Sequence, residues 1–236
     1  MIRLKSAQDI ILIKKAIVIG NKALKYATKI TEVGITTKEI DLKVEEFISK
    51  YKSIPSFKGY EGFPASCCIS INEQIIHGVP SERRIENGDV VKIDVGVCYK
   101  NRYSDQAITI IIGKVKSKEH TKLIKATKLA LVRAQKVAIV GNKIGNISYE
   151  IERTAKENDL GIVYEYAGHG VGFGVHEDPL VPNVSNKTND FELIPGLIIA
   201  IEPMFTLGKG KLIKTNNGVV TEDGSVGAHF EQTIII

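Results

Sequence analysis

Apolar residues in the first part of the chain recur with the spacing of a single helix face. One stripe runs through Ile10, Ile13, Ile17, Leu24 and Ala27, which predicts an amphipathic helix. Residues 36–39 (TTKE) have the form of a capping box, in which the Thr and Glu side chains bind each other's backbone N–H groups. A second helix is therefore predicted from residue 37, with an apolar side made of Ile40, Val44, Phe47, Ile48 and Tyr51.

The second half of the chain repeats this order. Helical spacing returns in residues 123–137 and 147–155, and Asn146 is the predicted N-cap of the latter helix. Residues 85–94 (IENGDVVKID) resemble residues 193–202 (LIPGLIIAIE) at an offset of 108. Each of these segments has a glycine turn followed by an apolar strand that ends in a carboxylate. We interpret the pattern as a duplication, and a chance similarity between two apolar strands is the alternative.

The duplication predicts an α+β fold made of two pseudo-symmetric halves, each a pair of helices with a sheet. The halves span about residues 1–115 and 116–236. Because no linker rich in Pro, Gly or Ser separates them, one domain over residues 1–236 is expected. Pseudo-symmetry would bring Asp94 and Glu202 to related positions, where a site can form between the halves.

Two aspartates are predicted to share one face of a β-hairpin. Residues 90–98 alternate as a strand does, and Lys100 with Asn101 forms the predicted two-residue turn. In that register Asp94 lies opposite Ala107, on the same face as Asp105. Both carboxylates would then reach a pair of metal ions about 3.5–4 Å apart. A solvated hairpin face is the alternative interpretation.

Two histidines lie in the glycine-rich segment 167–177 (AGHGVGFGVHE). Glycines allow the backbone to approach a site closely, so His169 and His176 are predicted to face one cavity. A dinucleotide-binding loop is the competing interpretation, because residues 170–172 begin a G-x-G-x-x-G pattern. Val175 stands where that pattern requires its last glycine, and no βαβ pattern surrounds the segment.

Two further carboxylates belong to apolar strands. Glu202 closes the repeated strand, and Glu231 lies in the apolar segment that ends the sequence. A charge in a buried strand needs a partner. A structural salt bridge would satisfy Glu231 as well as a metal ion would.

Composition excludes several classes of protein. The 236 residues are 43% hydrophobic and 25% charged, which is ordinary for globular proteins and excludes disordered and collagen-like chains. No apolar run approaches the roughly 20 residues that span a bilayer, and the first residues lack a signal-peptide core. Three cysteines cannot form an even set of disulfides, and no C-x-x-C is present. A reduced, cytoplasmic location without a structural zinc site is therefore expected.

The net charge of +5 comes from lysines spread along the chain. Solvated helix faces explain this distribution, and a weak attraction to RNA or to the ribosome surface is the alternative. No nucleic-acid motif and no array of stacking aromatic residues favours specific nucleic-acid binding.

Six segments carry a family resemblance: 62–72 (GFPASCCISIN), 76–80 (IHGVP), 93–96 (IDVG), 168–177 (GHGVGFGVHE), 201–204 (IEPM) and 230–233 (FEQT). In this order they resemble the type I (bacterial) methionine aminopeptidases, members of the pita-bread metallopeptidases of family M24. The resemblance covers nearly the whole chain and implies the pita-bread fold. The 33-residue gap between His169 and Glu202 leaves no room for the helical insertion of the type II enzymes.

The resemblance also implies a function, removal of the initiator methionine from nascent proteins whose second residue is small. Two divalent metal ions would be held by Asp94, Asp105, His169, Glu202 and Glu231. Metal-bound hydroxide would attack the scissile carbonyl, and Glu202 would transfer the proton. His77 and His176 would bind the substrate and stabilise the oxyanion and the leaving amide.

The oxygen-rich ligand set suits cobalt, manganese or iron, with zinc and nickel as further candidates. The expected partners are the N-termini of nascent polypeptides and, as a further candidate, the ribosome surface. No membrane and no specific nucleic acid is expected as a partner. A monomer is predicted because no pattern of a dimer seam is present.

By the same resemblance, the methionine pocket would be lined by Tyr60, Phe63, Cys68, Val175 and Val219. The last two positions often carry Phe and Trp in relatives. Each change removes aromatic contact worth about 1–2 kcal/mol, so a wider pocket is predicted.

Two other functional classes remain as alternatives: a non-catalytic binding protein on the same fold, and a related peptidase of other N-terminal specificity, such as Xaa-Pro cleavage. All five candidate ligands are present, which argues against the first. His120 and His229 match no family role and are interpreted as ordinary surface or edge histidines.

Overall fold

The computed structural model describes residues 2–185 and 191–236. Its helices within these ranges are α1 (Ala7–Ile30), α2 (Thr37–Ser49), α3 (Lys118–Val137), α4 (Ile144–Glu157) and a short 3-10 helix, η1 (Tyr60–Gly62). The strands of the first half are β1 (Ile54–Pro55), β2 (Cys68–Ile71), β3 (Gln74–Ile76), β4 (Val90–Tyr99) and β5 (Arg102–Ile111). Those of the second half are β6 (Gly161–Ile162), β7 (Ala167–Gly170), β8 (Glu177–Pro182), β9 (Ile198–Ile201), β10 (Met204–Thr206), β11 (Leu212–Thr215), β12 (Gly218–Thr221), β13 (Gly227–His229) and β14 (Glu231–Ile235).

Helix starts follow local capping, with one correction. The predicted capping box of α2 is confirmed, because Thr36 and Glu39 bind each other's backbone N–H groups. The prediction of Asn146 as the N-cap of α4 is wrong. The N-cap is Lys143, and the Asn146 side chain accepts its backbone N–H at 2.8 Å. The helix starts earlier because Ile144 is itself buried.

The main sheet is antiparallel and has the order β1-β4-β5-β14-β9-β7-β8, with β2 also paired to β4. Strands β4 and β5 of the first half correspond to β9 and β14 of the second. At the centre of the sheet β5 pairs with β14, and β4 and β9 flank this pair on its two sides. This arrangement confirms the α+β, pseudo-twofold fold. The division near residue 115 remains a prediction.

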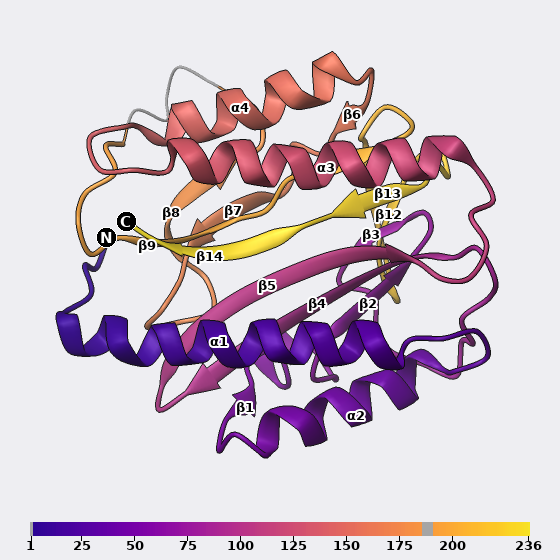
Figure 1. Ribbon diagram of the computed structural model, residues 1–236, viewed down its shortest axis with the longest axis horizontal. Coiled ribbons are helices and arrows are strands. Elements are labelled where there is room, and N and C mark those ends of the chain that lie inside the picture. Colours follow the sequence, from indigo (N-terminus) through magenta and orange to yellow (C-terminus); the bar gives the residue numbers. More distant parts are fainter. Residues whose placement is uncertain (1, 186–190) are drawn as a thin grey trace.

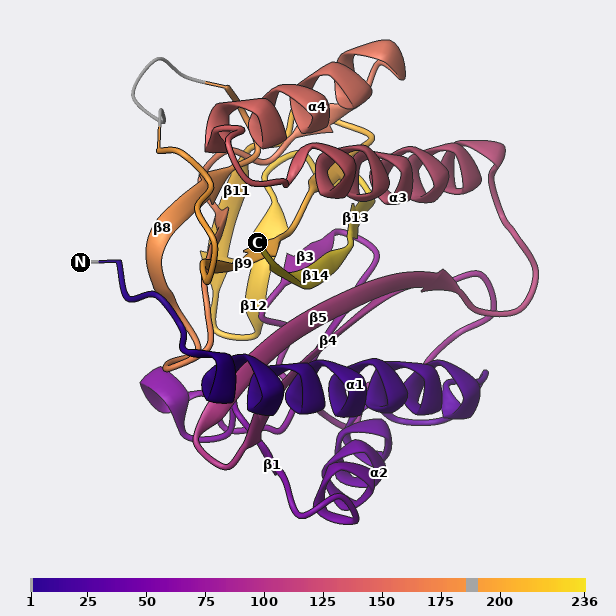
Figure 2. The same cartoon turned by 60° about the vertical axis from the view of Figure 1, so that its left-hand side comes forward.

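Each half has its own helix pair and its own core. Helices α1 and α2 cover the first half of the sheet, whereas α3 and α4 cover the second (Figure 1). The view of Figure 2, turned by 60°, shows the same separation of the two helix pairs. One buried cluster joins α1 and α2 to β4, and another joins α3 and α4 to β9. The helices therefore cover one face of the sheet and leave the other to the site.

Two small sheets, β13-β10-β6 and β11-β12-β3, complete the described part of the chain. Within it, none of the helices combines the length and apolar character needed to span a membrane.

Candidate dimetal centre and substrate cavity

A cavity of about 750 Å³ opens on the sheet face away from the helices. Its lining includes most of the predicted site residues, namely Tyr60, Phe63, Cys68, His77, Asp94, Asp105, His169, His176, Glu202 and Glu231. These residues come from both halves of the chain, so the fold brings the two sets together.

The β4–β5 hairpin places the two aspartates. Lys100 and Asn101 have φ values of 49° and 58°, as a type I′ turn requires, and Tyr99 pairs with Arg102. This turn sets Asp94 opposite Ala107, which confirms the predicted register. Since side chains alternate along a strand, Asp94 and Asp105 lie on one face. Both side chains are almost fully buried.

The glycines beside His169 allow three strands to approach one another. A Cβ at Gly168 would lie 2.3 Å from the Ala200 carbonyl oxygen of β9. A Cβ at Gly170 would lie 2.1 Å from the Asp178 carbonyl oxygen. Such separations are shorter than van der Waals contact, so only glycine fits at either position. β7 thereby holds His169 directly over the cavity.

The His169 ring is oriented by its own backbone. Nδ1 lies 2.9 Å from the Gly170 carbonyl oxygen, so Nδ1 carries the proton and donates to it. The unprotonated Nε2 faces Glu202 and Glu231, at 4.0 Å and 3.7 Å from one carboxylate oxygen of each. This tautomer leaves a nitrogen lone pair for a metal ion.

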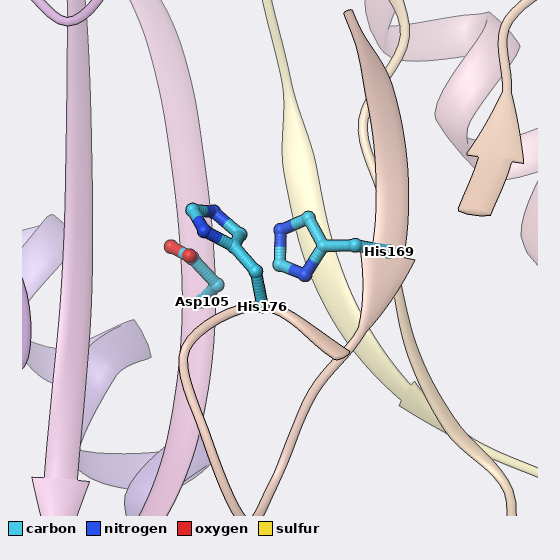
Figure 3. Close-up of side chains that lie close together, drawn as sticks. All are labelled: Asp105, His169 and His176. Atoms are coloured by element: carbon cyan, nitrogen blue, oxygen red, sulfur yellow. The ribbon is translucent and has the colours of Figure 1, made fainter. Parts of the chain in front are cut away.

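Two groups of potential ligands overlap inside the cavity. His169, Glu202 and Glu231 have ligand atoms within 4.8 Å of one another, and so do Asp94, Asp105 and Glu231. Glu231 is common to both groups. A third group joins Asp105 to His169 and His176, whose side chains point toward one another in Figure 3. Such overlap is the geometry that two adjacent cations need.

The electrostatics of the site also fit a cation. Burial raises the pKa of Asp105 and of Glu202 to about 8, and it raises the pKa of Asp94 and of Glu231 well above the usual values. Neighbouring carboxylates raise the pKa of Asp94, Asp105 and Glu231 further. Asp94 Oδ1, Asp105 Oδ1 and Glu231 Oε1 are buried without a hydrogen-bond partner in the described structure. Four crowded carboxyl groups, three of them with an unpartnered oxygen, fit divalent ions and are costly without them.

The other two predicted histidines lie at the cavity mouth. The His176 ring contacts the His169 ring edge-on at 4.4 Å between centroids, and its Nδ1 lies 3.1 Å from the Tyr60 hydroxyl. The His77 ring packs edge-on against Tyr166 at 5.7 Å. Desolvation by the cavity walls lowers the pKa of both histidines, so both rings are neutral near pH 7.

The five predicted pocket residues do not all reach the cavity surface. Tyr60, Phe63 and Cys68 line it. Val175 is buried in the cluster behind these residues. Val219 belongs to a separate cluster with Ile76 and its neighbours, and neither valine is part of the cavity lining.

The interpretation of His229 as an ordinary surface histidine is wrong. Its exposed fraction is 1%, it lines the cavity, and its Nε2 lies 3.2 Å from a Glu202 oxygen. Sequence reasoning missed this residue, although His229 and Glu231 are two positions apart and so point to the same side of an extended chain. His120, by contrast, is half-buried at the start of α3.

Comparisons with known proteins agree with this geometry. The model of metallopeptidase family M24 matches residues 11–236. A methionine aminopeptidase from Clostridium acetobutylicum is 41% identical over 240 residues, covering 100% of this chain and 95% of its own length. One from Clostridium perfringens is 42% identical over 238 residues, with coverage of 100% and 95%.

Solved structures of metallopeptidases also match this chain. The methionine aminopeptidase from Thermotoga maritima matches with a TM-score of 0.97 at 36% identity, covering 100% of this chain and 96% of that one. The prolidase from Pyrococcus horikoshii matches with a TM-score of 0.77 at 26% identity. This chain covers only 60% of that prolidase.

Proposed function

The chain belongs to metallopeptidase family M24, and from that premise we propose that it removes the N-terminal methionine from polypeptides whose second residue is small. Relatives that are methionine aminopeptidases match over the full chain. The observation that carries the proposal is the overlap of two ligand groups at Glu231 inside one cavity. We take residues 1–236 as one catalytic domain that acts in the cytoplasm, which three buried free cysteines favour.

In this proposal Asp94 would hold one divalent ion, His169 with Glu202 would hold the other, and Asp105 and Glu231 would be ligands shared by the two sites. Four carboxylates and one imidazole favour manganese, iron or cobalt over ions that prefer thiolates. Such a pair of ions supplies a Lewis acid and lowers the pKa of a water molecule, which makes that water a nucleophile near neutral pH.

The protein's own residues then move the proton and bind the reacting group. Glu202 is buried and lines the cavity, so in this proposal it accepts the proton of the attacking water and delivers it to the leaving amine. In this proposal the Tyr60 hydroxyl, which keeps its proton because burial raises the pKa of the phenol, donates to Nδ1 of His176 at 3.1 Å.

That hydrogen bond assigns the His176 proton to Nε2, where it can donate to the substrate. His77 is the second neutral donor, and a positive φ of 57° directs its side chain from the end of β3 into the cavity. Together the two rings would stabilise the charge on the carbonyl oxygen and the leaving amide. Tyr60, Phe63 and Cys68 supply apolar surface for the methionine side chain, with Val175 as support behind them.

Mass spectrometry of peptide products tests the proposal. Protein loaded with Mn²⁺ or Co²⁺ is incubated with Met-Ala-Ser and with Met-Leu-Ser peptides, and EDTA-treated protein is the control. We expect loss of methionine from the first peptide only, and only with metal. Cleavage of neither peptide by protein that demonstrably binds metal would refute the methionine assignment, and a screen of other N-terminal residues, including Xaa-Pro, would follow.

A further inference from the structure

His229 lies beneath the candidate metal centre and is held there by its backbone. It ends β13, one residue before β14 begins at Glu231. The Thr109 hydroxyl accepts the His229 N–H at 2.9 Å and donates to the His229 carbonyl oxygen at 2.6 Å. Because Thr109 belongs to the central strand β5, these two bonds fix the histidine relative to both halves of the sheet.

The ring of His229 faces the same two glutamates as His169, but it lies nearest to their other carboxylate oxygens. His229 Nε2 lies 3.2 Å from Oε2 of Glu202 and 3.8 Å from Oε2 of Glu231. His169 Nε2 faces the Oε1 atoms of the same two residues. Each glutamate therefore has one oxygen toward His169 and the other toward His229.

The surroundings of the ring determine which nitrogen carries the proton. The exposed fraction of His229 is 1%, and a neutral imidazole enclosed in this way carries a single N–H group. Both ring nitrogens are buried without a hydrogen bond of good geometry among the described residues, but only Nε2 is close to carboxylate oxygens, with Glu202 Oε2 at 3.2 Å. An Nε2–H group has acceptors within reach and an Nδ1–H group has none, so the Nε2–H tautomer is favoured.

We propose that His229 is a positioning residue for the metal centre: its Nε2–H donates to Glu202 Oε2 and thereby turns Glu202 Oε1 toward His169 and the ion they share. The inference rests on the proposed dimetal site. Hydrogen bonds from such supporting groups orient metal-binding carboxylates, and their loss weakens metal affinity by about 10–100-fold. His229 would thus act on the same carboxylate that transfers the proton, without touching the substrate's reacting atoms.

Metal affinity provides the first test. Mn²⁺ binding to metal-free protein is measured by calorimetry for wild type, H229Q and H229L, with F205L as the control variant. Phe205 is buried in β10, pairs with Ala228 of β13 and lies outside the cavity lining. We expect H229L to bind Mn²⁺ about 10–100-fold more weakly. H229Q should retain affinity within a few fold because its amide still donates, and F205L should lose stability but not affinity.

Equal weakening in H229L, H229Q and F205L would show a structural role only and would overturn the proposal. Wild-type affinity in H229L would overturn it as well. Should H229L not fold, the comparison of H229Q with H229N decides, because the shorter Asn amide cannot reach Glu202. The proposal then requires weaker binding for H229N than for H229Q.

Two spectroscopic measurements separate positioning from direct ligation. In ¹⁵N NMR of histidine-labelled protein, His229 should show the neutral Nε2–H tautomer both with and without Mg²⁺, a diamagnetic divalent probe. X-ray absorption of Co²⁺-loaded protein should show the same number of imidazole ligands in wild type and H229Q. Loss of one imidazole in H229Q would identify His229 as a sixth ligand and contradict the proposal.

These readouts do not depend on peptide cleavage. If wild-type protein binds metal as expected but releases no methionine, the proposed function fails while the role of His229 remains testable. If it releases methionine and H229L binds metal like wild type, only the role of His229 fails.

Discussion

The two halves of the molecule contribute to the centre in different ways. The first half supplies Asp94 and Asp105 from one hairpin, whose register is set by a two-residue turn. The second half supplies His169, Glu202 and Glu231 from three separate segments, brought together by the pairing of β7, β9 and β14. The first set is therefore local in sequence, and the second depends on long-range packing.

The metal centre should therefore tolerate substitutions better in the first half than in the second. The hairpin should keep its register when one residue of the turn is substituted, because ten residue pairs connect β4 and β5. In the second half the strands approach so closely that single atoms matter, as at Gly168. Changes of similar size should thus have larger effects on the second half.

The largest effect should follow loss of Glu231, the residue common to two ligand groups. We expect E231Q to lower kcat/KM by at least about 10³-fold, or about 4 kcal/mol of transition-state stabilisation, and to weaken binding of both ions. D94N should weaken the binding of only one ion. Peptide kinetics combined with metal titration check this prediction. An E231Q protein that still binds two metal ions tightly would contradict the assignment of Glu231 to both ligand groups.

The next largest effect should come from G168A, compared with G174A. The new Cβ in G168A would lie 2.3 Å from the Ala200 carbonyl oxygen, whereas in G174A the nearest atom is 3.7 Å away, an ordinary contact. We expect G168A to lower the free energy of unfolding by about 1–3 kcal/mol and to weaken metal binding, since His169 would move. G174A should change neither property. Denaturant unfolding and Mn²⁺ calorimetry decide, and equal behaviour of the two variants would speak against the close approach.

The stability of the metal-free protein should fall as pH rises. The pKa values of Asp105 and Glu202 are raised from 3.8 and 4.5 to about 8 in the folded state, so the folded state binds more protons than the unfolded state between pH 4 and 8. The contribution of these two groups to the free energy of unfolding is fully present below pH 4 and is lost as pH rises through 8.

Thermal unfolding in EDTA at several pH values measures this dependence. For the metal-free protein we expect a lower Tm at pH 8 than at pH 5. The decrease of Tm with pH should be smaller in D105N, and Tm should change little with pH in protein loaded with Mn²⁺. A metal-free Tm that rises over the same range would contradict the account of crowded carboxyl groups.

The smallest effect should come from the turn of the first half. Asn101 has a φ of 58°, which Asn and Gly tolerate and β-branched residues do not. N101V should cost about 1 kcal/mol of stability and N101G almost nothing, and both should bind Mn²⁺ as wild type does. A variant that folds but has lost the metal would show that the hairpin is less robust than we infer.

Sequence reasoning anticipated what local patterns determine. The helical stripes, the capping box at Thr36 and the hairpin register all depend on residues near one another, and the structure confirms them, except that α2 ends at Ser49, before Tyr51. The pseudo-twofold fold was visible in the repeat of residues 85–94 and 193–202, because both halves keep the same alternation.

What sequence reasoning missed depends on non-local contacts. Nothing in the residues around His229 shows that it pairs with Met204 of β10 or that its backbone bonds to Thr109 of β5, and these contacts enclose the histidine. Likewise, the separation of Val219 from the cavity follows from the pairing of β12 with β3. The start of α4 was misplaced for a local reason, because Asn146 caps from inside the first turn.

Anomalous diffraction from crystals grown with Mn²⁺ would locate the metal ions relative to the two halves of the molecule. The account predicts two peaks in the cavity, one beside Asp94 and one beside His169 and Glu202, with Asp105 and Glu231 between them. A single peak held by one half alone, or peaks away from Glu231, would contradict a centre shared by the two halves.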